Sequence, residues 1–194
     1  MSAPAHAVPP HVVLGPTLRT ERLILRPPAV EDFPRWAEFM ADPETARFIG
    51  GVQPKAQVWR TLCSVAGMWA LTGEGMFSVI EQSTGRWIGR IGPLHPYGWP
   101  GREVGWSLHR DATGRGYAVE AAAAAMDYAF DVLGWDDVIH CIEPDNRASA
   151  AVAERLGSRN RGPGVLPEPM QDHRIDLWGQ TRDEWALNRQ APTR

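Results

Sequence analysis

Three features of the sequence predict an α/β fold in which helices flank a central sheet. Strand-like and helix-like segments alternate through the second half of the chain. The first half ends in two apolar runs joined by a short turn, and a glycine-rich loop links a strand to an alanine-rich helix. Of the 194 residues, 43% are hydrophobic and 22% are charged. This composition suits one domain with a sizeable core.

The first half of the chain is expected to place helices between its opening and closing strands. Apolar spacing and turn residues predict, in order, a strand at 18–26, helices at 30–40, 43–48 and 53–70, and strands at 77–81 and 87–91. The longest of these helices carries Val58, Leu62, Val65 and Trp69 along one face. The turn Ser83-Thr84-Gly85 predicts that the last two strands form an antiparallel pair.

The second half alternates between strands and helices. The pattern predicts, in order, a strand at 103–109, a helix from about Gly116 to Leu133, a strand at 138–142, a helix at 148–156 and a late strand at 174–178. Asn146 stands where the second of these helices would be N-capped. Residues 157–172 contain clustered prolines and glycines without a periodic pattern, so we expect an irregular loop there and no strand.

The segment Thr113–Ala118 has the composition of a phosphate-binding loop. Gly114 and Gly116 let an anion approach the main chain, and the helix that follows adds free N–H groups and the positive end of its dipole. Val119 stands where a dinucleotide fingerprint needs a third glycine, and a nucleotide P-loop needs a lysine that is missing here. The loop therefore predicts another pyrophosphate-bearing ligand. The alternative is a tight turn before a helix, without a ligand.

Several motifs in this order resemble the GNAT acetyltransferases. The stretch from Glu103 to Gly157 resembles the core of that superfamily. The segments GRGYAVEA, DYAF, PDNRAS and AERLG resemble the branch that acetylates the N-termini of ribosomal proteins, the RimJ/RimL type. TERLILRP and RDEW extend the resemblance from about Leu18 to Trp185. It implies a mixed, mostly antiparallel central sheet that is splayed into a V and flanked by helices.

The resemblance also implies that acetyl-CoA is the co-substrate. In this family, main-chain amides of a Q/R-x-x-G-x-G/A segment hold the pyrophosphate, and Thr113 takes the place of the usual Gln or Arg. The pantetheine arm pairs with the strand before the loop, and Asn146 is expected to bond to the cofactor from the opposite side. The residues expected to contact acetyl-CoA are Ser107, Leu108, His109, Thr113, Gly114, Arg115, Gly116, Tyr117, Ala118 and Asn146.

Acetyl transfer to an amine needs a base for the amine proton and a donor for the developing oxyanion. Glu103 is the candidate base, because it occupies the position of a glutamate that is common in the branch. Strand alternation places Glu103, Gly105, Ser107 and His109 on one face. The alternative is a solvated glutamate at a strand edge. As in the family, an unpaired N–H near Leu108 is expected to stabilise the oxyanion.

The departing thiolate also needs a proton. Many relatives use a tyrosine in the helix after the Asn, but the corresponding residue here is Ala153. Ser149 matches a serine of the RimL-type motif and is the candidate donor. Its alternative role is to satisfy amides in the first turn of the helix. Ser158 stands where the family places an aromatic residue, a departure that bears on the packing of the last two strands.

The histidines suggest no metal site. His140 lies in an apolar run and is expected to be a satisfied core residue, whereas His95 and His173 are candidates to border the acceptor site. No H-x-x-H or H-E-x-x-H spacing occurs, so we expect no metal. The loop at 157–172 is expected to fold over the acceptor.

Composition limits the partners and the compartment. A net charge of -3 argues against a nucleic-acid partner. Cys63 and Cys141 form no C-x-x-C motif, which suggests reduced thiols in the cytoplasm. No long apolar run occurs, so we expect no membrane association. We expect flexible tails at 1–17 and 189–194 and a single domain at 18–188, as a monomer or a homodimer.

These features together predict an enzyme, an acetyl-CoA-dependent N-acetyltransferase. It would transfer the acetyl group to a primary amine, on a protein N-terminus or a small molecule, by direct attack in a ternary complex. The alternative is a non-catalytic acyl-CoA sensor or interaction module, which Ala153 and Ser158 favour. Transfer to a hydroxyl group is a further alternative.

Overall fold

The structure is a computed structural model and describes residues 14–190, which build an eight-stranded sheet. The strands are β1 (Leu18–Arg19), β2 (Leu23–Arg26), β3 (Phe77–Glu81), β4 (Arg86–Leu94), β5 (Glu103–Leu108), β6 (Asp137–Ile142), β7 (Arg159–Gly164) and β8 (Ile175–Thr181). Their order in the sheet is β1-β2-β3-β4-β5-β6-β8-β7. All neighbours are antiparallel except β5 and β6. The prediction of an α/β fold with a mixed, mostly antiparallel sheet is confirmed.

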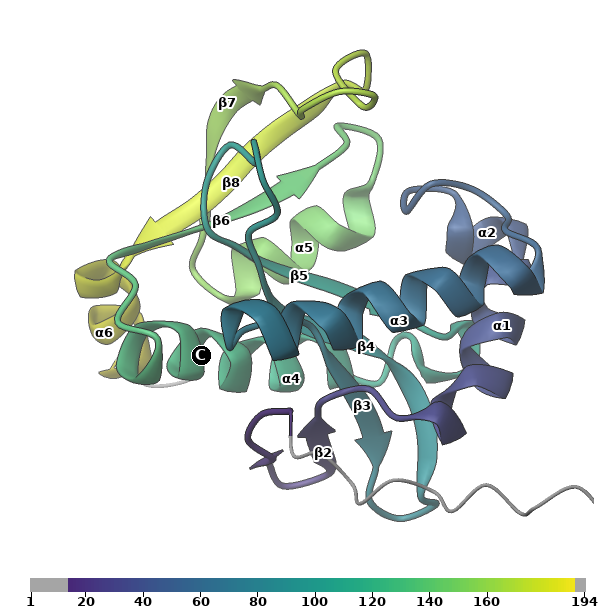
Figure 1. Cartoon of the computed structure of the whole chain (residues 1–194). Helices are drawn as coiled ribbons and strands as arrows, with labels where there is room; N and C mark the ends of the chain where they lie inside the picture. The colour runs from purple at the N-terminus through teal and green to yellow at the C-terminus, as the bar shows by residue number, and fades with distance from the viewer. Residues whose placement is uncertain (1–13, 191–194) are drawn as a thin grey trace, which may run out of the picture.

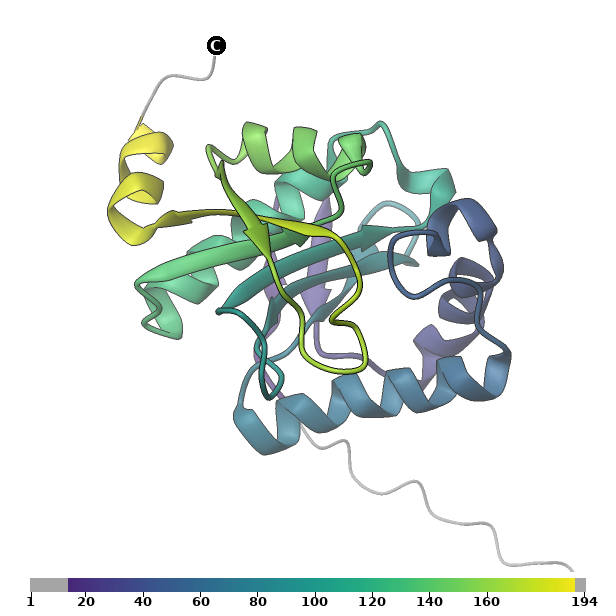
Figure 2. The same ribbon diagram turned by 90° about the horizontal axis from the view of Figure 1, so that it is seen from above.

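Helices cover both faces of the sheet (Figures 1 and 2). They are α1 (Phe33–Ala41), α2 (Pro43–Ala46), α3 (Lys55–Thr72), α4 (Tyr117–Asp127), α5 (Arg147–Arg155) and α6 (Arg182–Gln190). Short turns of helix lie at η1 (Val30–Asp32), η2 (Arg110–Ala112) and η3 (Tyr128–Val132), the last of them π-helical. No helix of the described chain is long and apolar enough to cross a membrane.

Two apolar cores hold these layers together. Helices α1 and α3 pack Trp36, Phe39 and Val58 against one face of the sheet. Helix α4 packs its alanines and Met126 against Val104 on the other face. The four residues predicted along one face of the long helix are all buried, which confirms the helical spacing. In Figure 2, α3 lies along one side of the sheet and α5 lies on the other.

The sheet opens between β5 and β6. These strands pair only at Glu103 and Ile139, whereas β4 and β5 pair over six positions. Beyond Glu103 one edge of β5 has no neighbouring strand, so the two halves of the sheet diverge toward the ends of β5 and β6. The divergence lies where β5 leads into η2 and the glycine-rich loop, and it therefore positions the site described below.

Two predictions about strands are wrong. Residues 18–26 form the hairpin of β1 and β2, because Thr20 N–H donates to the Leu23 carbonyl at 3.0 Å and closes a turn. Within the predicted loop, residues 159–164 form β7. It is an edge strand with a register shift between Asn160 and Pro163, and such an edge tolerates a proline that cannot donate to a neighbour. Most of the expected tails, 1–17 and 189–194, lies outside the described residues.

Ser158 joins a buried polar network in place of the family's aromatic residue. Gln180 Nε2 donates to Ser158 Oγ at 2.9 Å, and Ser158 Oγ lies 2.9 Å from His140 Nε2. His140 Nδ1 lies 2.7 Å from the Val104 carbonyl oxygen. A carbonyl only accepts, so His140 is protonated at Nδ1 and accepts at Nε2 from Ser158. The prediction that His140 is a satisfied core residue is confirmed. The network links β5, β6 and β8 through Val104, His140 and Gln180.

Candidate active site

The glycine-rich loop ahead of α4 presents main-chain donors without partners. Gly114 and Gly116 have φ angles of 71° and 80°, a left-handed conformation that residues with side chains adopt only with strain. No described residue accepts a hydrogen bond from either amide. The first amides of α4, which begins at Tyr117, are free by helix geometry. The loop is therefore a cluster of free N–H groups at the positive end of a helix.

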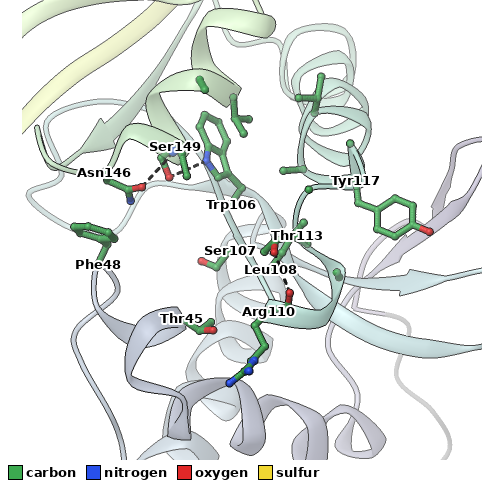
Figure 3. A pocket seen from close by; sticks show the side chains of 18 of the residues that line it. Thr45, Phe48, Trp106, Ser107, Leu108, Arg110, Thr113, Tyr117, Asn146 and Ser149 are labelled. Carbon is green, nitrogen blue, oxygen red and sulfur yellow. Dashed lines mark hydrogen bonds between the residues drawn. The ribbon is translucent and has the colours of Figure 1, made fainter.

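Side chains behind the loop hold it in place. Arg22 Nη1 donates to the Arg115 carbonyl at 3.0 Å and also pairs with Glu120 at 2.6 Å. Tyr117 OH donates to Glu81 Oε1 at 2.6 Å, and this bond is the main cause of the lowered pKa of Glu81. Arg115 lies 3.1 Å from the same carboxylate. The Tyr117 ring therefore points away from the cavity in front of the loop, which leaves its main chain facing inward (Figure 3).

A cavity of about 1040 Å³ extends from this loop to the start of α5. Of the predicted contact residues, the following line it: Ser107, Leu108, Thr113, Gly114, Gly116, Tyr117, Ala118 and Asn146. Figure 3 shows the labelled members of this set arranged around one hollow. His109 and Arg115 line neither this cavity nor the second one. The His109 amide donates to the Ile88 carbonyl at 2.8 Å, so it is not available to a ligand.

The start of α5 is fixed by two hydrogen bonds. Asn146 Oδ1 accepts from the Ser149 amide at 3.1 Å, as predicted for an N-cap. Trp106 Nε1 donates to Ser149 Oγ at 3.2 Å, which ties α5 to β5 (Figure 3). Since Ser149 Oγ accepts the indole proton, its own hydroxyl hydrogen is free to point into the cavity. The alternative role, in which the Ser149 hydroxyl satisfies local amides, is wrong. Instead, the Ser149 amide donates to the Asn146 side chain.

The open edge of β5 offers main-chain groups at alternate residues. Because His109 N–H points to β4, the same is expected of Ser107, and the groups of Trp106 and Leu108 point to the open edge. The Val104 carbonyl, which bonds to His140 on that side, has the same parity. Of the strand residues predicted to lie along the thioester, only Leu108 has its main chain at this edge. Trp106, which the sequence analysis did not single out, has the same orientation.

A second cavity, of about 450 Å³, lies on the α1–α3 side of β5. Glu103, Gly105 and Ser107 line it from one face of the strand, as alternation predicted. The segment between β7 and β8 contributes Leu166 and Met170, consistent with a loop that folds over this side. In Figure 2 that segment reaches across the sheet toward α3. Both cavities share Phe48, Ile49, Trp106, Ser107, Asn146 and Ser149, so they meet at the open edge of β5.

Glu103 is the buried carboxyl group of the second cavity. Only 7% of the residue is exposed, so the alternative of a solvated strand-edge glutamate is wrong. Oε2 accepts from Trp99 Nε1 at 2.6 Å, and Oε1 accepts from the Cys141 amide at 3.2 Å. Burial raises the pKa of Glu103 above its ordinary value, although both hydrogen bonds act in the opposite direction. The same burial, and the nearby Glu103 charge, raise the pKa of the Cys141 thiol.

Some of the remaining candidate residues line a cavity, and others do not. His173 lines the second cavity, with Nδ1 3.9 Å from Glu143, whereas His95 is exposed and lines neither cavity. Ala153 is wholly buried and lines neither. The sequence analysis missed Arg90, which lines the second cavity. Strand alternation was the one available signal, since Arg90 pairs with Ser107 and shares its face.

The site thus combines free main-chain amides in one cavity with a buried carboxyl group in the other. The model of the acetyltransferase (GNAT) domain family matches residues 22–159. The chain therefore belongs to the GNAT acetyltransferase family.

Relatives and solved structures agree with this assignment. The chain is 31% identical over 150 residues to an uncharacterized N-acetyltransferase, p20, of Bacillus licheniformis. The matched region covers 75% of this chain and 84% of p20. It is similar to an acetyltransferase from Agrobacterium tumefaciens, with a TM-score of 0.77, 35% identity and coverage of 92% of this chain and 99% of that one. A putative ribosomal-protein-serine acetyltransferase from Vibrio cholerae, with 16% identity, a TM-score of 0.72 and coverage of 88% and 99%, shows the same fold.

Proposed function

We propose that the protein transfers the acetyl group of acetyl-CoA to a primary amine by direct attack in a ternary complex. The observation that carries this proposal is that the two cavities meet at the open edge of β5. The free amides at Gly114, Gly116 and the start of α4, which we call the anion seat, lie in one cavity. The buried carboxyl group of Glu103 lies in the other. Two substrates bound in these cavities would face each other across the Leu108 amide and the Ser149 hydroxyl.

The first cavity fits acetyl-CoA. Free amides at Gly114, Gly116 and the start of α4 suit the pyrophosphate, and left-handed glycines leave the main chain open to it. The free edge of β5 offers main-chain groups of Trp106 and Leu108 to the extended arm. Asn146 lines the opposite side of the cavity.

Bound acetyl-CoA would supply an activated acyl group whose thioester carbonyl is attacked by the amine. The Leu108 N–H is the donor with the orientation to stabilise the oxyanion, because it points to the free edge. Glu103 accepts the amine proton, directly or through water. Its raised pKa lies closer to that of an amine than an ordinary carboxyl would, which favours general-base catalysis near neutral pH.

Ser149 is the candidate to protonate the departing thiolate, since its hydroxyl hydrogen is free at the junction of the cavities. No tyrosine takes this role in the described residues: Tyr117 lines the first cavity but donates to Glu81, and Tyr97 and Tyr128 line neither cavity. A coenzyme A thiol is acidic enough to leave with water as its proton donor, so activity does not require a tyrosine.

We also propose the RimJ/RimL-like branch, on the motifs that run from residue 103 to 157. The acceptor is then an amine, on a protein N-terminus or a small molecule, and neither nucleic acid nor membrane is a partner. The cytoplasm is the proposed compartment, and a monomer or a homodimer the proposed assembly.

Thiol release tests the proposal against the sensor alternative. Acetyl-CoA binding is measured by calorimetry, and free coenzyme A is measured during incubation with a panel of primary amines and alcohols. An enzyme of the proposed kind binds acetyl-CoA and releases thiol only when an amine is present. Binding without thiol release from any amine would favour the sensor, and release with alcohols alone would identify a hydroxyl acceptor.

A further inference from the structure

Arg90 is a half-buried cation without a side-chain partner in the described chain. Its Nε atom is shielded from solvent and has no hydrogen-bond partner. No acidic side chain of residues 14–190 comes within 4.0 Å of its guanidinium group. Its guanidinium group lies over the Trp36 ring, with Cζ 5.4 Å from the ring centroid. Burial lowers the pKa of Arg90 to about 10, so the group stays charged at neutral pH.

An unpaired charge that is partly removed from water is costly, and another arginine of the sheet has a carboxylate partner. Arg26, at the end of β2, donates through both terminal nitrogens to Asp32, at 2.6 and 2.9 Å. Asp32 in turn accepts a hydrogen bond from Ser78, which is the residue of β3 that pairs with Arg90 of β4. The Asp32 carboxylate is thus already engaged. Arg90 has no carboxylate partner among the described residues.

The register of the sheet places Arg90 and Glu103 on one face of the second cavity. Arg90 pairs with Ser107, and Leu94 pairs with Glu103, so the two groups are four residues apart along the strands. At 3.3 Å per residue this is a span of about 13 Å between their main chains. Gly105 lies between them on β5 and also lines the cavity. The cavity therefore carries a cation at one end and a carboxyl group at the other.

A second polar atom in the same cavity is also unsatisfied. Gln53 lines the cavity, and its Oε1 is buried without a hydrogen-bond donor. A buried amide oxygen needs a donor, as the guanidinium needs an acceptor. The cavity of about 450 Å³ thus holds one unpaired donor and one unpaired acceptor. Such a pair suits a small polar ligand that carries both an acceptor and a donor.

We propose that the acceptor amine is a small molecule that also carries a carboxylate, with the carboxylate bound by Arg90 and the amine directed to Glu103. This inference rests on the proposed acetyl transfer and names the substrate class of the same site. Polyamines and aminoglycosides do not fit, because they bring more positive charge to Arg90 and no anion to pair with it. A peptide N-terminus offers only a neutral carbonyl at the matching position.

The test compares amino carboxylates with their uncharged counterparts. A series of ω-amino carboxylates of increasing length is assayed beside the methyl esters of the same compounds, with acetyl-CoA saturating. The wild-type chain should prefer one length of the carboxylate over its ester by at least tenfold in kcat/KM. The variant R90M should lose this preference, because methionine keeps the apolar stem and removes the charge.

Arg86→Met is the matched control, since Arg86 lies on the same strand, pairs with the exposed Asp111 and lines neither cavity. R86M should keep the preference. A melting temperature for R90M at or above the wild-type value shows that the variant folds, as expected when an unpaired charge is removed from a partly buried position. Equal kcat/KM for carboxylate and ester in the wild-type chain, with turnover of both, would overturn this inference and leave acetyl transfer standing.

Calorimetry of the amino carboxylates without acetyl-CoA separates the two proposals. Carboxylate binding that is at least tenfold weaker in R90M supports the inference even if no thiol is released, in which case the proposed transfer fails alone. Preferential turnover of peptides with free N-termini over every amino carboxylate would also overturn the inference, and it would assign a protein acceptor instead.

Discussion

The Glu103 carboxylate accepts a hydrogen bond from the Cys141 amide at the point where β5 and β6 stop pairing. Two residues earlier on β6, the Ile139 amide still donates to the main chain of β5, at the Arg102 carbonyl. A continued parallel sheet would give the Cys141 amide a main-chain acceptor as well. A side chain takes that place here. The proposed base therefore also satisfies the strand that diverges from it, which couples its protonation to the geometry of the opening.

Replacing Glu103 by Gln should remove the base and keep one of its two hydrogen bonds, because the amide has a single accepting oxygen and its NH2 group would face the other N–H donor. We expect kcat/KM for the amine to fall by about 10² to 10⁴. The wild-type rate should fall as the pH drops through the raised pKa of Glu103, whereas E103Q should show only the titration of the amine itself. Initial rates across pH provide the measurement. Glu143→Gln, which removes another carboxyl of the same cavity, is the control. A wild-type profile in E103Q would exclude Glu103 as the base.

The same variant should remove a pH-dependent loss of stability. The folded-state pKa of Glu103 lies above its ordinary value of 4.5, so the folded chain holds the proton more tightly than the unfolded chain does. Stability is therefore lost as the pH rises from about 4.5 through the raised pKa. E103Q avoids this loss, so its melting temperature relative to that of the wild type should rise by a few degrees between pH 4 and pH 8. The hydrogen bond that E103Q loses lowers its stability equally at both pH values; a difference that stays constant with pH would contradict the assigned shift.

Substitution of Gly116 should weaken acetyl-CoA binding. Its φ of 80° strains any residue with a Cβ, and the added Cβ would lie 3.4 Å from Arg22 Nη2, which braces the loop. We expect G116V to bind acetyl-CoA at least tenfold more weakly by calorimetry, because the amides at the loop shift. Gly85, with φ of 67° and nothing near its Cβ, lies in the β3–β4 turn and lines neither cavity. Unchanged affinity in G116V, matched to G85V, would count against the anion seat.

His140 should make the fold sensitive to acid. Burial lowers its pKa from 6.5 to about 4, because a second proton on the ring would break the bond from Ser158 and leave a buried charge. The unfolded chain takes up that proton first, so stability falls as the pH drops from about 6.5 to 4, by about 3 kcal/mol in total. Urea unfolding across this range measures it. His140→Gln should be less stable at pH 7 and show a flatter slope, whereas exposed His95→Gln should match the wild type.

Local signals account for what the sequence could predict. Gly114 and Gly116 lie next to a helix with clear spacing, so the glycine turn ahead of α4 could be predicted without knowledge of distant segments. The capping role of Asn146 is equally local, since its partner Ser149 is three residues away. β7 escaped prediction because its pairing with β8 is set by an edge position, where Pro163 is tolerated despite its poor strand propensity.

Long-range packing decides the rest of the site. Alternation places Arg90 on a face of β4, but that face becomes a cavity wall only because α1 and the segment after β7 come to lie beside it. For Glu103, the choice between a solvated and a buried carboxyl depended on Trp99 and Cys141, and Cys141 is 38 residues away. The orientation of Tyr117 likewise depended on Glu81 from another strand.

Substitution of Ser149 distinguishes a catalytic from a structural role. Replacing it by Ala removes the free hydroxyl and leaves Trp106 Nε1 without its acceptor. The main-chain amide of residue 149 still donates to Asn146 Oδ1. If the hydroxyl protonates the thiolate, S149A should lower kcat and leave acetyl-CoA affinity unchanged. An acetyl thioester with a more acidic thiol, which leaves without a proton, should restore much of the lost rate. Trp106→Phe removes the same indole bond and keeps the hydroxyl, so it reports the structural contribution alone. Equal losses in both variants, with no recovery on the more acidic thioester, would show that Ser149 only ties α5 to β5.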